Sequence, residues 1–139
     1  MAAKNNVYGA LADYIAAELE RTVWVDEATE KDALPYIVII DNGCPKHWCY
    51  ESVWWADCNF DIAIFAANGD LAKEIGAEVQ TLFGPANSQA AITTDGTIKF
   101  IAITEGRWQF SIEPDLQVGG ARVYRYTCNY NTQIEGREE

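Results

Sequence analysis

Residues 58–67 constrain the fold of this chain more than any other segment, because they predict a largely buried strand. Phe60, Ile62 and Ile64 alternate along one face of this segment, as side chains do in a β-strand. The opposite face is also mostly apolar, through Ala63 and Phe65. A short apolar run of this kind is typical of the interior of a sheet.

An amphipathic helix is predicted directly after that strand. Either Asn68 or Asp70 can accept hydrogen bonds from the first N–H groups of a helix. Across residues 71–83 apolar side chains recur every three or four positions and form a single stripe. Gly84 is expected to end the helix in a left-handed conformation, and Pro85 prevents its continuation. A buried strand that leads into such a helix is a packing unit rather than a catalytic site.

The remaining segments predict a second helix and several further strands. Apolar residues at every fourth position indicate a helix over residues 7–19, and Asp95-Gly96 and Gly119-Gly120 indicate turns. Pro114 is expected to stop the strand that precedes it. Strands are predicted at 23–25, 36–40, 47–67 (one strand or two with a bulge), 89–93, 97–103, 108–113 and 122–130.

The order of these elements is helix, strands, helix, strands, which predicts an α+β fold with two helices packed on a mainly antiparallel sheet. The 139 residues are enough for one domain with a core of its own. We expect this core to span about residues 7–130. Residues 131–139 are expected to form a polar, mobile C-terminal tail without core residues.

The charge of the chain excludes broad binding to nucleic acids. Ten Lys and Arg residues stand against 21 Asp and Glu residues, which gives a net charge of −11. Nucleic-acid affinity comes largely from basic side chains that neutralise phosphates, and an anionic membrane surface would repel this chain for the same reason. No apolar run approaches the roughly 20 residues needed to span a bilayer, and no secretory signal pattern is present. We therefore expect no membrane partner.

Familiar catalytic patterns are absent from the sequence. His47 is the one histidine, and no phosphate-binding loop, dinucleotide fingerprint or serine-hydrolase elbow occurs. Lys99 lacks the acidic residue two positions before it that a nuclease-type metal centre would use, since Thr97 stands there. We expect no enzyme activity, no catalytic residues and no cofactor.

Three cysteines and the histidine lie close together in the sequence, at Cys44, His47, Cys49 and Cys58. Thiolates and an imidazole are the ligands of structural zinc sites, although the usual pattern has two tight pairs. A Cys44–Cys49 disulfide is a further alternative, but the lack of a secretory signal favours reduced thiols. Simple burial or exposure of these side chains is the preferred interpretation, and Cys128 is expected to fill space in the core.

Aromatic residues are more abundant than one small core needs. Neighbouring strand residues point to opposite faces, so adjacent tryptophans cannot share one side of a sheet. Either both faces are covered and these residues are core, or some of them lie at subunit interfaces. The interface candidates are Trp48, Trp54, Trp55, Tyr126 and Tyr130.

Taken together, the element order resembles that of tail-completion and tail-terminator proteins of long-tailed bacteriophages, also called minor tail or neck proteins. The segments that carry this resemblance are Ala10-Leu11 with Ile15, residues 35–39, residues 60–64 leading into 71–83, and residues 122–127. The resemblance covers about residues 7–130. Residues 44–55 depart from it, because they are unusually rich in Cys and Trp.

The resemblance implies a structural virion protein that forms a ring, commonly a hexamer, at the junction of head and tail. Such a ring either ends growth of the tail tube or joins the finished tail to the head. Its implied partners are other copies of itself, the tail tube protein and a head-completion or connector protein, and DNA passes through the lumen without specific binding. The implied location is the neck or tail of the virion, after assembly in the host cytoplasm. Two alternatives stay open: a small α+β ligand- or protein-binding module with a pocket lined by Trp54 or Trp108, and a zinc-stabilised protein.

Overall fold

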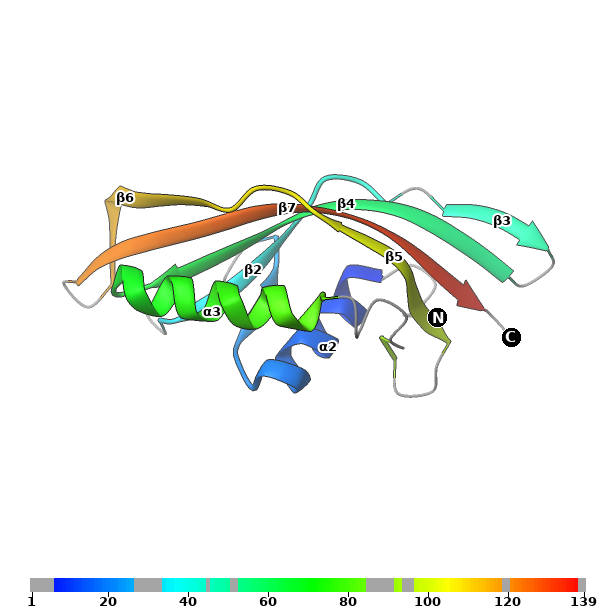
Figure 1. Ribbon diagram of the computed structural model, residues 1–139, viewed down its shortest axis with the longest axis horizontal. Coiled ribbons are helices and arrows are strands. Elements are labelled where there is room, and N and C mark those ends of the chain that lie inside the picture. Colours follow the sequence, from blue (N-terminus) through cyan, green and yellow to red (C-terminus); the bar gives the residue numbers. More distant parts are fainter. Residues whose placement is uncertain are drawn as a thin grey trace.

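Two long antiparallel strands form the middle of the sheet (Figure 1). The computed structural model describes residues 7–26, 34–44, 46–50, 53–84, 92–93, 97–118 and 121–137. Strand β4 (Val53–Ala66) pairs with β7 (Ala121–Arg137) along its whole length, from Val53 opposite Arg137 to Ala66 opposite Tyr124. β4 contains the segment that the sequence predicts as a buried strand, and its even-numbered residues from Trp54 to Ala66 are all buried. The central position of this strand is thus confirmed.

Shorter strands flank this central pair on both sides. β2 (Tyr36–Asp41) and β3 (Lys46–Tyr50) follow each other along the outer edge of β4. β5 (Ile98–Glu105) and β6 (Gln109–Val118) do the same along the outer edge of β7. β1 (Val23–Val25) lies parallel to β2 and completes a seven-stranded sheet in the described part of the chain. The predicted α+β class is therefore confirmed, and 47–67 forms two strands rather than one.

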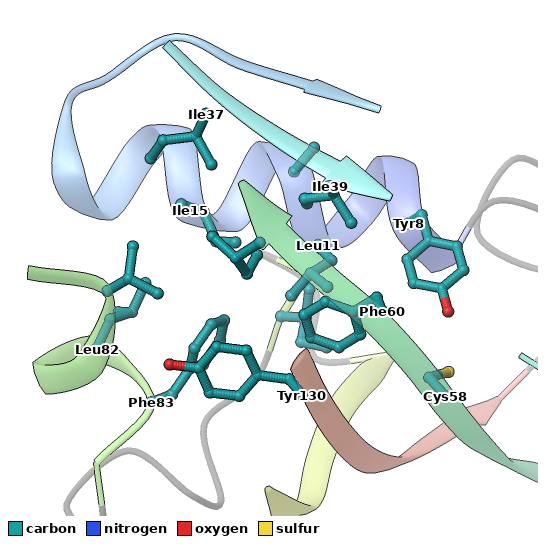
Figure 2. Close-up of a cluster of buried hydrophobic side chains, with 14 of the residues drawn as sticks. Tyr8, Leu11, Ile15, Ile37, Ile39, Cys58, Phe60, Leu82, Phe83 and Tyr130 are labelled. Carbon is teal, nitrogen blue, oxygen red and sulfur yellow. The ribbon is translucent and has the colours of Figure 1, made fainter. Parts of the chain in front are cut away.

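Both helices, α2 (Val7–Leu19) and α3 (Gly69–Leu82), lie on the same side of the sheet (Figure 1). Their apolar stripes and the facing strand residues make one core, in which the rings of Phe60 and Tyr130 stack with centroids 5.8 Å apart (Figure 2). Phe83 follows α3 directly, and its ring packs against that of Tyr130 with the centroids 5.0 Å apart. None of the helices in the described residues is both long enough and apolar enough to cross a membrane.

The start of α3 follows the sequence prediction, but its end does not. Asn68 rather than Asp70 is the N-cap, and its side-chain oxygen accepts a hydrogen bond from the Leu71 N–H at 2.7 Å. The prediction of a left-handed Gly84 is wrong, since its φ is not positive. The Gly84 N–H instead donates to the Thr81 carbonyl at 3.1 Å, a tight final turn that needs no left-handed residue.

The C-terminal segment is also different from the prediction of a mobile polar tail. Residues 131–137 continue β7 between β4 and β5, and Ile134 is fully buried. Polar side chains at alternate positions, such as Asn131 and Gln133, lie on the face of the sheet without helices. The sequence pattern does not predict this strand, because only alternate residues of 131–137 are buried. These are Thr132, Ile134 and Gly136, of which only Ile134 has a large apolar side chain.

Pro114 does not end β6, which continues to Val118. The pairing with β7 shifts register between Glu113 and Gln117, so the ladder is irregular where the proline occurs. Proline is tolerated at such irregularities and at sheet edges because no ladder N–H is required there. The predicted turns at Asp95-Gly96 and Gly119-Gly120 lie outside the described residues.

Candidate assembly interface

An aromatic row runs along the last two strands on the helix side of the sheet. The alternation of strand side chains puts Phe110 and Ile112 of β6 on one face, with Trp108 just before the strand. Phe110 is in register with Tyr126 and Ile112 with Tyr124 across the β6–β7 pair. The Trp108 ring stacks on Tyr126 with centroids 4.7 Å apart, and Phe110 stacks on Tyr124 at 5.8 Å.

Helix α3 supports this row with two glycines. A Cβ atom at Gly69 would lie 2.9 Å from the Phe110 ring, and one at Gly76 would lie 2.6 Å from Tyr126 Cδ2. Real side chains do not approach so closely, so only glycine lets the helix approach these rings. Lys73 lies on the same stripe of the helix, with its Nζ 5.0 Å from the centroid of the Phe110 ring. The outer aromatic residues are thus held in place.

Hydrogen bonds to Glu105, at the end of β5, fix the inner end of the row. Glu105 Oε1 accepts hydrogen bonds from Trp108 Nε1 at 2.6 Å and from the Tyr130 hydroxyl at 3.0 Å. Burial, followed by the hydrogen bond to Glu105, raises the pKa of Tyr130 far above its usual value. Tyr130 therefore stays a neutral donor, and Trp108 is held between its hydrogen bond to Glu105 and its stacking on Tyr126.

The outer end of the row is open to solvent. Phe110 is 40% exposed and Ile112 is 43% exposed, the large apolar side chains that stand out as exposed in the described part of the chain. Among the described strands β6 pairs with β7 alone, so its other side presents unpaired backbone N–H and C=O groups. Fixed aromatic groups next to an open strand edge can bind another protein surface. We call this surface, made by Lys73, Phe110, Ile112, Arg122 and Tyr124, the β6 edge.

The sequence-predicted interface residues are only partly found on the surface. Trp54 and Tyr130 are fully buried in the core of the chain itself, so they offer no surface to another subunit. Trp55 and Tyr126 are half-buried, and Tyr126 belongs to the aromatic row. The side chain of Trp48 lies outside the described residues. Phe110 and Ile112 were not singled out from the sequence, because their alternation predicts a half-buried strand and gives no sign that it is an edge.

The cysteine cluster forms a disulfide instead of a set of thiolate ligands. Cys44 and Cys58 are bonded to each other, with their Cα atoms 4.0 Å apart. The expectation of reduced thiols is therefore wrong for this pair. The alternative Cys44–Cys49 disulfide is wrong as well, because Cys44 is bonded to Cys58. The segment that follows β2 stays hydrogen-bonded to β4 through Asn42, Gly43 and Asn59, which brings residue 44 opposite β4. Spacing in the sequence does not reveal this pairing.

A zinc site at the four predicted residues loses two of its ligands to that bond, since disulfide sulfurs are not thiolates. The side chains of His47 and Cys49 lie outside the described residues. In the described ranges no group of three metal-binding side chains comes together. Cys128 is buried as predicted, and this burial, with the charge of Glu105, raises the pKa of its thiol to about 11.

The face of the sheet without helices is polar in its middle. Asn129 Nδ2 donates to Asn59 Oδ1 at 3.0 Å and to Asp61 Oδ1 at 2.8 Å, and Asn59 Nδ2 donates to Asn131 Oδ1 at 2.6 Å. Next to this network is an open hollow of about 330 Å³. Its lining residues are Asp57, Cys58, Asn59, Ala102, Thr104, Asn131, Thr132 and Gln133. Neither Trp54 nor Trp108 lines it, so it is not the pocket that the binding-module alternative predicts.

Comparison with known proteins gives similarity in structure and none in sequence. No protein-family model and no curated protein matches the chain. Among solved structures, a chain from "Virion of native gene transfer agent (GTA) particle" matches with a TM-score of 0.54 and 18% identity, over 94% of this chain and 92% of that one. This chain has the fold of that virion chain. A second solved structure, at 14% identity, covers 93% of this chain and 92% of its own with a TM-score of 0.45.

Proposed function

We propose that this chain is a structural virion protein of a tailed phage, a tail-completion or tail-terminator subunit that forms a ring at the junction of head and tail. The observation that carries this proposal is the shared fold with a chain from a gene transfer agent virion, which extends over nearly the full length of both chains. The element order of the sequence favours the same class of protein. The expected role is structural, without catalysis or a cofactor.

The β6 edge fits a subunit that works through surfaces alone. It combines an open strand edge with the Phe110 ring, which lies against Gly69 and Lys73 of α3 and stacks on Tyr124. Fixed side chains lose little conformational entropy on association, which favours assembly of many copies. Open edges of this kind are covered when neighbouring subunits associate.

The strong negative charge fits a ring through which DNA passes. With a net charge of −11, the chain repels phosphate groups instead of holding them. In this proposal six copies surround the lumen, the tail tube protein binds one side, and a head-completion or connector protein binds the other. The ring assembles in the host cytoplasm and stays in the neck or tail of the virion.

Deletion of the gene from its phage tests the proposal. Because a ring adaptor supplies only docking surfaces, we expect DNA-filled heads and tails to accumulate separately, as seen by electron microscopy of lysates. Tails of normal length indicate a completion or neck role, and overlong tubes indicate a terminator. The wild-type gene supplied in trans is the control and should restore joined particles. Normal infectious particles from the deletion strain would rule out the proposed function.

A further inference from the structure

We propose that the Cys44–Cys58 bond is a reversible redox site, in which Cys44 exchanges with thiols and disulfides from solution and Cys58 is the resolving cysteine. The reagents are low-molecular-weight thiols of the glutathione class and their disulfides. This site goes beyond the proposed function and does not depend on it, because it concerns the chain alone.

Hydrogen bonds hold the two cysteine-bearing segments together independently of the disulfide. The Asn42 N–H donates to the Asn59 carbonyl at 3.0 Å, and the Asn59 N–H donates to the Gly43 carbonyl at 2.9 Å. The Tyr8 hydroxyl of α2 lies 3.0 Å from the same two carbonyl oxygens, which both accept from it. These carbonyl groups belong to the residues that directly adjoin the two cysteines. Opening the bond therefore leaves the two sulfurs as neighbours that can bond again.

The Tyr8 side chain that joins these carbonyl groups is itself fixed in the core. It is 7% exposed, and its ring packs edge-on against Phe60 with the centroids 5.9 Å apart. Burial, followed by the negative charge of Asp41, raises the pKa of Tyr8 far above its usual value, so the hydroxyl stays a donor. None of these contacts uses a cysteine sulfur, so they are available in both redox states.

The two cysteines differ in how far solvent reaches them. Cys58 is 2% exposed and belongs to the core cluster that contains Tyr8 and Phe60 (Figure 2). Cys44 is partly exposed and packs against this cluster from its edge. A thiol ionises more easily near water than in an apolar core, and the thiolate is the reactive form. Cys44 is therefore the cysteine of this pair that meets a reagent first.

Opening of the bond proceeds through a mixed disulfide on Cys44. A thiolate of the glutathione class attacks Cys44 Sγ, so that a new S–S bond forms there and the Cys44–Cys58 bond breaks. The electron pair of the broken bond leaves with Cys58 Sγ, which takes a proton from water. A second small thiolate attacks the small-molecule sulfur of the mixed disulfide and releases Cys44, which also takes a proton. Two small thiols are thus oxidised to one small disulfide while the protein bond is reduced.

Closing of the bond is the reverse reaction, with a small disulfide as the oxidant. The Cys44 thiolate attacks this disulfide, releases one small thiolate and becomes a mixed disulfide. Cys58, held beside it, gives up its proton to solvent and displaces the second small thiolate. The bond therefore forms in oxidising surroundings and opens in reducing ones. Because the closed bond stabilises the chain, the surroundings set its stability without a change of fold.

Alkylation of the reduced, folded chain tests which cysteine reacts first. The full chain is reduced, freed of reductant, pulsed with iodoacetamide and digested with trypsin, which cleaves after Lys46 and separates Cys44 from Cys49. We expect Cys44 to react about tenfold or more faster than Cys58 and Cys128, which are both buried. In denaturant the three rates should become similar, which is the control for the reagent. Equal rates for Cys44 and Cys58 in the folded chain would overturn their proposed roles.

Single serine variants test the mixed disulfide. With oxidised glutathione, Cys58→Ser should keep glutathione on Cys44, because no resolving thiol displaces it. Cys44→Ser should carry about tenfold less glutathione on Cys58, since burial protects that thiol. Cys128→Ser is the matched control and should close the Cys44–Cys58 bond as the wild type does. Equal adducts on both cysteines, or none on Cys44, would contradict the proposal, and melting curves check that each variant is folded.

Titration of the wild-type chain with mixtures of reduced and oxidised glutathione tests reversibility. Since the closed loop is expected to stabilise the folded chain, the effective concentration of the two thiols should be about 100-fold higher in the folded chain than in denaturant. Similar effective concentrations in the two states, or a bond that glutathione opens only after unfolding, would rule out a redox site in the native chain. None of these outcomes bears on the proposed function, which deletion of the gene tests separately.

Discussion

Gly136 lies directly against the indole ring of Trp54. A Cβ atom at position 136 would overlap the six-membered part of that ring. The two residues face each other across the β4–β7 pair, where Trp54 is in register with Gly136. The last strand of the chain therefore packs over a buried tryptophan, and the glycine leaves room for the ring.

Gly136→Ala should destabilise the chain by about 1–3 kcal/mol, because overpacking a core forces side chains or backbone to shift. Chemical denaturation with fluorescence detection measures the change, and Trp54 emission should also respond. Arg137→Ala is the control, since its side chain is exposed and its substitution should have an effect below about 0.5 kcal/mol. Equal stability of Gly136→Ala and the wild type would show that residues 131–137 are not packed on the core.

Reduction should lower the melting temperature of the wild-type chain. The Cys44–Cys58 bond closes a loop with a sequence separation of 14, for which loop-closure entropy gives about 3 kcal/mol of stabilisation. Thermal unfolding with and without a thiol reductant measures this. Cys44→Ser should show the lower melting temperature under both conditions, and Cys128→Ser should keep the response to reductant. A wild-type protein whose mass under non-reducing conditions shows only free thiols would contradict the bond.

The ion pair between Arg21 and Glu78 should make stability depend on pH. The hydrogen bond from Arg21 is the main cause that lowers the pKa of Glu78 in the folded chain. Because the folded pKa lies below the unfolded one, this stabilisation is present above the unfolded pKa of about 4.3 and is lost as pH falls through the folded value.

We expect Glu78→Gln to cost about 1 kcal/mol or less near pH 7, as for other partly exposed ion pairs. The difference from the wild type should shrink as pH falls below the unfolded pKa of about 4.3, because the wild-type carboxylate takes up a proton as pH passes through its lower folded pKa. Denaturant titrations at several pH values measure this difference, with Asp13→Asn as the control at an exposed carboxylate of α2. A difference that is the same at pH 3 and pH 7 would mean that the ion pair does not form.

Duplex DNA should not bind the purified chain measurably near physiological salt. The net charge of −11, with ten basic residues against 21 acidic ones, leaves too little phosphate neutralisation. A fluorescence titration with labelled duplex DNA measures the dissociation constant. A repeat at low salt shows whether any weak attraction to the duplex exists. A dissociation constant tighter than about 1 μM would contradict the passive passage of DNA.

The sequence by itself determined the main elements of the chain. Alternation in 58–67 and the stripe in 71–83 predict β4 and α3, since side-chain periodicity follows from local backbone geometry. The same reasoning predicts α2, β1, β2 and the α+β class. It also gives the net charge and the lack of familiar catalytic motifs, which direct attention to surfaces and assembly.

Only the tertiary structure decided which residues face solvent and which residues meet. Trp54 and Tyr130 are core, whereas Phe110 and Ile112 are exposed, because β4 and β7 are central strands and β6 is an edge. Gly136 packs against Trp54 across the β4–β7 pair, and Cys44 is bonded to Cys58. Both contacts join segments that are apart in the sequence. Strand order and register depend on contacts between residues far apart in the chain, so a local pattern cannot specify them.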